Sequence, residues 1–310
     1  MKLHVIEGGV LSLLQDSGRF GSHRLGLTNG GPLDYHAFHY CNRLLQNAPD
    51  STVIEVSVGG LKLRADGDGF LCLTGAEMPL RIGDVECDGW TVHPVTDGDD
   101  IEIGFARAGC RAYLGVAGGF NIPACFGSTA TVPREGVGGL DGGPLQAGDI
   151  LEGDPVQRRR RLYLAEANRP RYHRHASVRV VPGYQVRHFD RIEQRRFFGA
   201  PYEVSERSDR MGYRLQGSPV RCRLDGILSE GICHGAVQVP PDGQPIVLLN
   251  DRQTIGGYPK IGAAIAPDTW RLAQLTPGST VHFAPVSPGT ARRVLELARR
   301  FSLDLPLRER

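Results

Sequence analysis

The chain alternates short apolar runs with polar turns over most of its length. Several runs are rich in β-branched residues, and Gly, Asp and Pro separate one run from the next. Many short strands at this spacing favour barrels or sandwiches over a βαβ array. The sequence therefore predicts a mainly β fold with few helices. The expected strands are residues 53–58, 70–75, 100–105, 111–118, 178–183 and 280–286.

Four segments follow a helical pattern instead. In residues 31–47 apolar residues recur at helical spacing, and Asp34 near the start suits the positive end of a helix dipole. In residues 287–301, Ser287 is a candidate N-cap. Shorter helices are expected around residues 188–197 and 267–275.

A basic, proline-containing segment near the middle of the chain interrupts the strand pattern. Because 310 residues exceed a comfortable single core, we expect two domains with their boundary in this segment. The predicted organisation is a first subdomain at 1–156, a basic linker at 157–176 and a second subdomain at 177–310. We interpret the arginines at 158–161 as a solvated connector, with a docking or nucleic-acid patch as the alternative.

Composition argues against several classes of protein. The formal charge is +2, from 36 Lys and Arg against 34 Asp and Glu, and this balance predicts no nucleic-acid partner. The seven cysteines lack any Cys-x-x-Cys spacing, which favours reduced thiols over disulfides or a zinc site. A signal-peptide core and long apolar runs are also missing. We therefore expect a cytoplasmic protein that neither crosses nor enters a membrane.

The familiar nucleotide-binding and hydrolase motifs do not occur. The sequence has no Walker A loop, G-x-S-x-G elbow, H-E-x-x-H pair or dinucleotide fingerprint. Residues 136–151 are Gly-rich and are predicted to form turns, with anion binding through backbone N–H groups as the alternative. His36 and His39 stand one helical turn apart but off the apolar stripe. We interpret them as solvated, so no metal site built from protein ligands is predicted.

Three segments gather charged and amide side chains where an apolar run ends. They lie at residues 13–21, 206–215 and 250–260. Each could be an ion pair that closes a loop. Together they favour a binding site, because Arg holds planar carboxylates through two hydrogen bonds and Gln can donate to or accept from an amide. Lys260, on a rigid turn after Tyr258 and Pro259, could meet phosphate or a developing oxyanion.

These segments resemble motifs of the biotin-dependent carboxyltransferase-domain family. The matching stretches include QDSGRFG (15–21), GVGGLDGGPLQAGD (136–149), SDRMGYRL (208–215) and NDRQTIGGYPKIG (250–262). They occur in the family's order, within a resemblance that covers nearly the whole chain. The resemblance implies two cyclophilin-like β-barrel subdomains with an active cleft between them.

The family includes the C subunit of bacterial 5-oxoprolinase, also described as allophanate hydrolase subunit 2 or KipA-like. The resemblance implies a protein that, together with the A and B subunits of 5-oxoprolinase, opens the cyclic amide 5-oxo-L-proline to L-glutamate with hydrolysis of ATP. A lactam is a poor electrophile because its nitrogen donates into the carbonyl, and phosphorylation of the amide oxygen would create a leaving group. ATP and Mg²⁺, held with a partner subunit, are then the expected cofactors.

Side chains in and near the matching motifs supply the expected site. The catalytic candidates are Asp251, Arg252, Lys260 and Asp209. The candidates for substrate binding are Arg210, Gln253, Tyr258, Gln15, Arg19 and Asn42. We expect Arg252 or Arg210 to hold the substrate carboxylate and Gln253 to bind the lactam amide. Lys260 would neutralise phosphate charge, and Asp251 or Asp209 would hold Mg²⁺.

Two other functions are compatible with the same residues. One is carboxyl transfer from carboxybiotin to a urea-like amide, with the biotin-carrying parts expected on separate proteins. The other is a KipA-like regulatory protein that binds a partner similar to the B subunit and does no chemistry. Biotin is an expected cofactor only in the first of these alternatives.

Overall fold

The described residues of the chain, 1–156 and 160–310 of a computed structural model, form two compact units. Unit 1 comprises Met1–Gly21, Asn29–Tyr172 and Leu303–Arg310, and unit 2 comprises Ser22–Thr28 and His173–Ser302. The predicted limits 1–156, 157–176 and 177–310 stay a prediction. Residues 157–159 of the predicted linker, with two of its arginines, lie outside the described residues.

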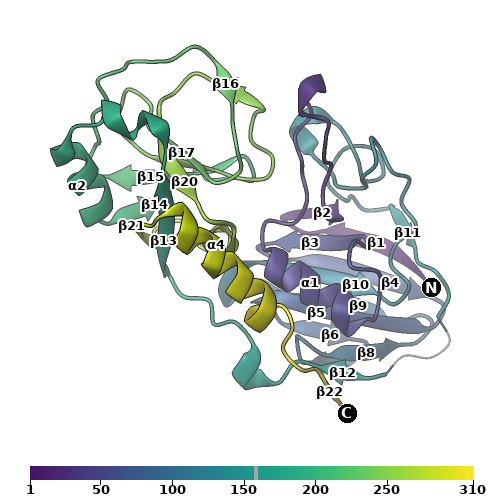
Figure 1. Cartoon of the computed structure of the whole chain (residues 1–310). Coiled ribbons are helices and arrows are strands. Elements are labelled where there is room, and N and C mark those ends of the chain that lie inside the picture. The colour runs from purple at the N-terminus through teal and green to yellow at the C-terminus, as the bar shows by residue number, and fades with distance from the viewer. Residues whose placement is uncertain (157–159) are drawn as a thin grey trace. The chain divides into compact units, whose positions relative to one another are not determined.

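Unit 1 is built from antiparallel sheets with one α-helix, α1 (Tyr35–Leu44). One sheet has the strand order β11-β1-β4-β9-β6-β7, a second has the order β2-β3-β10-β5-β8, and β12 pairs with β22 (Figure 1). The strands are β1 (Lys2–Gly8), β2 (Leu11–Gln15), β3 (Val53–Ser57), β4 (Leu61–Asp66), β5 (Gly69–Glu77), β6 (Leu80–Ile82), β7 (Val85–Cys87), β8 (Val92–Val95), β9 (Asp100–Ile103), β10 (Ala108–Val116), β11 (Ile150–Glu152), β12 (Leu162–Tyr163) and β22 (Arg308–Glu309).

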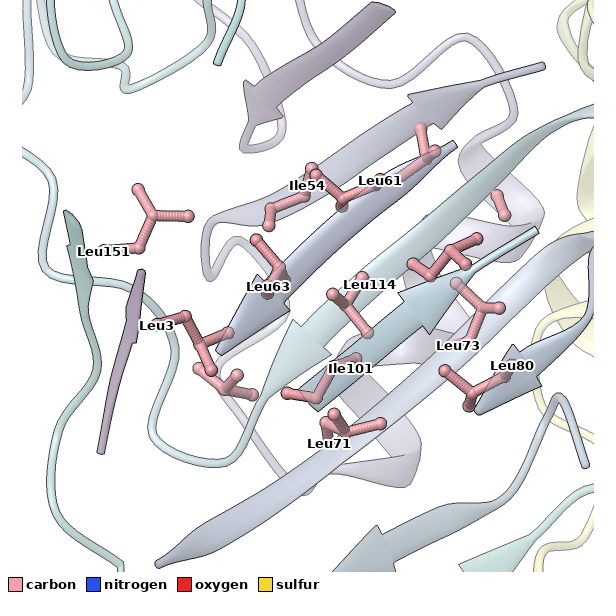
Figure 2. Packing of buried hydrophobic residues seen from close by; sticks show 14 of the residues in the cluster. Leu3, Ile54, Leu61, Leu63, Leu71, Leu73, Leu80, Ile101, Leu114 and Leu151 are labelled. Atoms are coloured by element: carbon pink, nitrogen blue, oxygen red, sulfur yellow. The ribbon is translucent and has the colours of Figure 1, made fainter. Parts of the chain in front are cut away.

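One hydrophobic cluster joins the two larger sheets of unit 1 (Figure 2). Leu3, Leu63 and Ile101 come from the first sheet, and Ile54 and Leu114 come from the second. These side chains are essentially inaccessible to solvent, and burying each one contributes about 1.5–3 kcal/mol. The alternating burial of β4 reflects one face of the first sheet turned into this core. Strand β3 of the second sheet is buried throughout, because α1 forms a second cluster with Val53 on its other face.

A buried polar network fixes the start of α1 on the second sheet. Asp34 caps the helix by accepting a hydrogen bond from Ala37 N at 3.1 Å. The Tyr113 hydroxyl accepts from Asp34 N at 2.8 Å and donates to Glu55 Oε2 at 2.7 Å. Tyr172 OH donates to Asp34 Oδ2 at 3.1 Å. Asp34 thus ends the preceding loop, caps the helix and joins it to the sheet.

Unit 2 contains a closed seven-stranded barrel with the order β13-β20-β17-β18-β15-β14-β21 (Figure 1). Its strands are β13 (His175–Pro182), β14 (Tyr202–Val204), β15 (Gly212–Gly217), β17 (Ala236–Gln238), β18 (Ile246–Leu248), β20 (Lys260–Ala264) and β21 (Thr280–Pro285). Two short strands, β16 (Glu230–Gly231) and β19 (Ile255–Gly256), pair with each other outside the barrel. The helices are α2 (Arg191–Gly199), α3 (Ala266–Leu272) and α4 (Pro288–Leu297).

The predicted mainly β fold with few helices is confirmed. All six predicted strand segments carry strands, and the strands of unit 2 close into a barrel, whereas those of unit 1 are divided between sheets. Ser287 caps α4 as predicted, because its hydroxyl accepts from Thr290 N. The seven cysteines are free thiols. No α-helix in the described part of the chain has both the length and the apolar character needed to span a membrane.

The Tyr113 hydroxyl should contribute measurably to the stability of unit 1. Tyr113→Phe removes one buried donor from Glu55 and one acceptor from Asp34, so we expect a loss of about 1–3 kcal/mol in the free energy of unfolding. Tyr172→Phe is the matched control, because it removes only the single bond to Asp34. Urea titration of the full chain measures both variants. Equal stability of Tyr113→Phe and the wild type would contradict the proposed anchoring of α1.

Candidate functional site

A buried ion pair stands directly after barrel strand β18. Arg210 Nε and Nη2 donate to the two carboxylate oxygens of Asp251 at 2.8 and 3.1 Å, and the two side chains are only 6% and 4% exposed. The same two residues are also joined through the backbone, because Asp251 N donates a hydrogen bond to Arg210 O. Charges buried this deeply require a partner. The pair therefore locks the loop before β15 to the loop after β18.

Arg252 connects the loop after β18 to a third segment, the one before β17. Its guanidinium is buried and donates to Ile232 O at 3.1 Å and Leu249 O at 3.2 Å. Burial lowers the pKa of Arg252, and the neighbouring Cys233 and Asp251 oppose that shift. The side chain therefore holds the segment before β17 against the loop after β18.

His234 lies beside this buried guanidinium. Burial first, and the positive charge of Arg252 second, lower the pKa of His234 from 6.5 to about 4, against the opposing effect of a hydrogen bond with Asn250. The imidazole is therefore neutral near pH 7.

Lys260 belongs to a different polar cluster, at the start of β20. Its ammonium forms an ion pair with Glu230, and its backbone N donates to Gln185 Oε1 at 2.7 Å. Gln185 Nε2 donates in turn to Glu230 Oε1 at 2.9 Å, and the Tyr184 hydroxyl also donates to Glu230. The hydrogen bond from Lys260 is the main cause of a lowered Glu230 pKa. The cluster ties the β16 segment to the barrel.

Strand pairing places four side chains in one row across the barrel. Arg214 of β15 lies opposite Ile246 of β18, and Ile246 lies opposite Gln238 of β17. Gln238 lies opposite Lys260 of β20, directly after a shift in register between Val237 and Gln238. Directly opposed residues share a face of the sheet, and the adjacent Val247 is fully buried on the other face. The row therefore lies on the outer face of the barrel.

A cavity of about 370 Å³ lies on this outer face of unit 2. The residues that line it include Ile246, Leu248, Gln238 and Gln253. Tyr258, whose side chain is 42% exposed, lines it as well. The cavity has the volume and the mixture of apolar and polar groups that small-molecule sites have in proteins.

The structure brings some of the predicted unit 2 residues together and separates others. Gln253, Tyr258 and Asp209 line the cavity. Arg210, Asp251 and Arg252 are instead buried in loop contacts, and Lys260 pairs with Glu230. The residues that the sequence did not single out are Arg214, Glu230, His234 and Gln238. Arg214 lies within the matching stretch 208–215, but only strand register brings it into one row with Gln238.

In unit 1 the predicted residues hold loops to the ends of strands. Gln15 Nε2 donates to Thr131 O at 2.9 Å, and Gly31 N donates to Gln15 Oε1 at 2.9 Å. Arg19 is fully buried, and its guanidinium donates to the backbone carbonyls of residues 125 and 130. Asn42, on α1, donates to a backbone carbonyl in the loop before β3. A cleft that joins residues of both units stays a prediction.

The two carboxylates predicted as alternatives for holding Mg²⁺ differ: Asp251 does not fit that role, and the role of Asp209 stays a prediction. Both oxygens of Asp251 accept hydrogen bonds from Arg210, and Asp209 Oδ1 accepts from the backbone N of Met211 and of Gly212. Within residues 1–156 and 160–310, no three His, Cys, Asp or Glu side chains are grouped to hold a metal ion. Asp251 and Asp209 therefore serve as loop anchors in this structure.

Comparisons with known proteins point to one family. The model of the "Carboxyltransferase domain, subdomain A and B" matches residues 25–285. The chain is 36% identical over 308 residues to the 5-oxoprolinase C subunit of Escherichia coli, covering 99% of this chain and 98% of that protein. It is 37% identical over 277 residues to the protein of the same name from Haemophilus influenzae, covering 88% of each.

A solved structure shares the fold over nearly the whole chain. The Kluyveromyces lactis urea carboxylase superposes with a TM-score of 0.90 at 25% identity. The alignment covers 98% of this chain but only 29% of that one. This chain thus corresponds to one part of a much larger protein in that comparison and to a full-length protein in the bacterial ones.

The buried Arg210–Asp251 pair should behave as a structural crosslink. Arg210→Met leaves the Asp251 charge buried without its main partner, so the free energy of unfolding should fall by about 3–5 kcal/mol. Adding Asp251→Leu to the same chain should recover most of that loss. A double-mutant cycle in urea measures the coupling.

A control for this cycle is the exposed pair of Arg64 and Asp100, which has the same two-bond geometry at 2.8 and 3.0 Å. Arg64→Met should leave stability nearly unchanged, because solvent screens the pair. If Arg210→Met proved equally harmless, the pair would not hold the loops.

His234 should make stability depend on pH. Its pKa is lowered in the folded chain, so the unfolded chain takes up a proton first as the pH falls. The stabilisation is present above pH 6.5 and is lost between 6.5 and about 4. His234→Asn should reduce this loss by up to about 3 kcal/mol. Urea titrations at several pH values measure it, with the exposed His282→Asn as control. Identical pH profiles for His234→Asn and the wild type would contradict the interpretation.

Proposed function

Since the chain belongs to the carboxyltransferase domain family, subdomains A and B, we propose that it is the C subunit of an ATP-dependent 5-oxoprolinase. With the A and B subunits it would open the cyclic amide 5-oxo-L-proline to L-glutamate. The observation that carries the proposal is the end-to-end match with the 5-oxoprolinase C subunit of Escherichia coli, at 36% identity over 99% of one chain and 98% of the other. A catalytic component of this kind would act in the cytoplasm.

The outer-face cavity of unit 2 supplies groups that suit a lactam. Ile246 and Leu248 line it and suit the methylene groups of a small ring, and the ring of Tyr258 can pack beside that ring. Gln253 can donate a hydrogen bond to a carbonyl oxygen. ATP, bound with a partner subunit, would supply the phosphoryl group that activates the lactam.

The charged residues of the motif would serve this site indirectly. Arg210, Arg252 and Asp251 set the path of the chain, and Gln253 follows them directly in sequence. Lys260 is the cation proposed to meet charge that develops on the substrate, once its contact with Glu230 yields. No step is assigned to Mg²⁺ at Asp251, because both of its carboxylate oxygens accept hydrogen bonds from Arg210.

Carboxyl transfer is the second candidate function. The fold match to the Kluyveromyces lactis urea carboxylase favours it, since nearly all of this chain superposes on that protein. A carboxamide and a nearby cation would also position a planar, urea-like acceptor. Against this function, the full-length relatives are 5-oxoprolinase subunits. A regulatory protein without chemistry is the third candidate.

Reconstitution separates these functions. The chain is purified alone and mixed with the A and B subunits of the same organism, and hydrolysis of ATP is measured with and without 5-oxo-L-proline. We expect lactam-dependent hydrolysis and glutamate formation only in the complete mixture. Mixtures that omit one component are the controls. Dependence on carboxybiotin would support carboxyl transfer instead, and tight binding to the B subunit with no turnover would support a regulatory role.

A further inference from the structure

The carboxylate of Glu230 is held by three donors from other segments of unit 2. Lys260 pairs with Glu230 Oε1, and Gln185 Nε2 donates a hydrogen bond to the same oxygen at 2.9 Å. The Tyr184 hydroxyl donates to the second oxygen, Oε2. Both oxygens of the carboxylate are therefore bound. A cation and two neutral donors placed in this way suit a planar anion with two oxygens.

The donors keep their positions through contacts that do not involve Glu230. Lys260 belongs to barrel strand β20, and its side chain is only 12% exposed. Gln185 is buried in the short helix Tyr184–His188. Its Oε1 accepts a hydrogen bond from Lys260 N at 2.7 Å, so its Nε2 is left to face the carboxylate. Tyr184, the first residue of that helix, is 66% exposed, which places the cluster at the surface of unit 2.

Glu230 itself comes from a segment that is held less firmly. It lies in β16, a two-residue strand that forms a separate sheet with β19 outside the closed barrel. Its side chain is 32% exposed, and Leu228 in the same segment is 94% exposed. Exposed segments with short strands open locally at a low cost in free energy. Glu230 can therefore leave the three donors while the barrel stays intact.

We propose that Lys260, Gln185 and Tyr184 form a binding site for the carboxylate of a small molecule. In the free chain, Glu230 occupies this site as an internal competitor. Its carboxylate marks where the two oxygens of a ligand would lie, so the space for them exists once Glu230 turns away. A buried ammonium needs an anionic partner, and exchange of one carboxylate for another keeps the charge of Lys260 compensated.

The internal competitor lowers the apparent affinity of the site. A ligand binds only the fraction of chains in which Glu230 has left, so its apparent affinity is the intrinsic affinity reduced by that fraction. The ordinary pKa of Glu230 is lowered by the hydrogen bond from Lys260 first and by that from Tyr184 second. The carboxylate is therefore charged near pH 7 and competes in its anionic form.

The proposed function gives the ligand an identity. Lys260 lies opposite Gln238, a residue that lines the outer-face cavity, so the carboxylate site and the cavity are neighbours in unit 2. 5-oxo-L-proline is a lactam with one carboxylate, and the charge that Lys260 meets is then the one that this substrate already carries. The choice of 5-oxo-L-proline rests on the proposed function. The assignment of a carboxylate site does not.

Glu230→Gln tests the internal competitor because it keeps the shape of the side chain and removes its charge. The probes are 5-oxo-L-proline, cyclopentanecarboxylate, which lacks the lactam, 2-pyrrolidinone, which lacks the carboxylate, and inorganic phosphate. Calorimetric titration of the full chain measures their binding. We expect both carboxylates to bind about 10-fold more tightly to Glu230→Gln, because a neutral amide competes less well for an ammonium. Binding of 2-pyrrolidinone should not change.

Lys260→Met shows whether the gain in affinity arises at this site. The variant should weaken carboxylate binding, and Glu230→Gln should have no further effect in a chain that already carries Lys260→Met. Glu296→Gln is the matched control, because Glu296 forms an exposed ion pair with Arg292 on α4. It should leave both carboxylate affinity and the thermal midpoint unchanged.

Three outcomes would overturn the carboxylate site. Glu230→Gln with a lowered thermal midpoint and an unchanged affinity for carboxylates would make the cluster a structural ion pair. Binding of inorganic phosphate, with no binding of either carboxylate, would assign the site to another class of anion. Absence of carboxylate binding by both the wild-type chain and Glu230→Gln would leave no site at all.

The same variants distinguish this inference from the proposed function. If cyclopentanecarboxylate binding depends on Lys260 and Glu230 as expected but the reconstituted complex does not turn over 5-oxo-L-proline, the site stands and the proposed function fails. If the complex is active and Glu230→Gln has a wild-type KM for 5-oxo-L-proline, the site is wrong and the function stands.

Discussion

The pairing of Arg210 with Asp251 is the constraint on which the organisation of the unit 2 site depends. Because the two charges are buried, each one needs the other as its partner. If the two loops separated, a charge would be left buried without its partner or exposed to solvent. Asp251, Arg252 and Gln253 are consecutive, so fixing the first two residues also fixes where the third leaves the loop. Thr28, in the segment Ser22–Thr28 that belongs to unit 2, donates a hydrogen bond to Asn250 O. A rigid frame of ion pair and backbone contacts therefore carries the more accessible Gln253.

Buried charged groups and buried neutral polar groups of unit 2 differ in whether they have a partner. In unit 2, Arg210 is paired with Asp251 and Lys260 with Glu230. Gln238 is buried without such compensation, and it is uncharged. This difference has a physical reason, since an unpaired amide in an apolar setting costs far less than an unpaired ion. A folded chain can leave a neutral donor without a partner more readily than it can leave a buried charge without one.

Sequence reasoning predicted the parts of this molecule that depend on local pattern. Alternation predicted β3 (Val53–Ser57) and β21 (Thr280–Pro285), and a single aspartate marked the start of α1. The charged residues of the motifs were harder to interpret. An Arg and an Asp that could bind a ligand can equally well form an ion pair with each other. Arg210 and Asp251 are 41 positions apart, and only the folded barrel decides between these two uses. The row from Arg214 to Lys260 is harder still, because alternation gives the face of a strand but not its partner or register.

The QDSGRFG stretch in unit 1 shows the same use of conspicuous residues for the scaffold. Asp16 accepts hydrogen bonds from Ser128 Oγ at 2.6 Å and Thr129 N at 2.8 Å, while Arg19 is fully buried against backbone carbonyls of the same loop. In each unit, the Asp and Arg side chains of the matching motifs thus hold loops closed. A family resemblance carried by such residues transfers the architecture securely, because those residues make it. The choice of ligand must then depend on side chains that these loops hold in place and that do not themselves close a loop, such as Gln253 in unit 2.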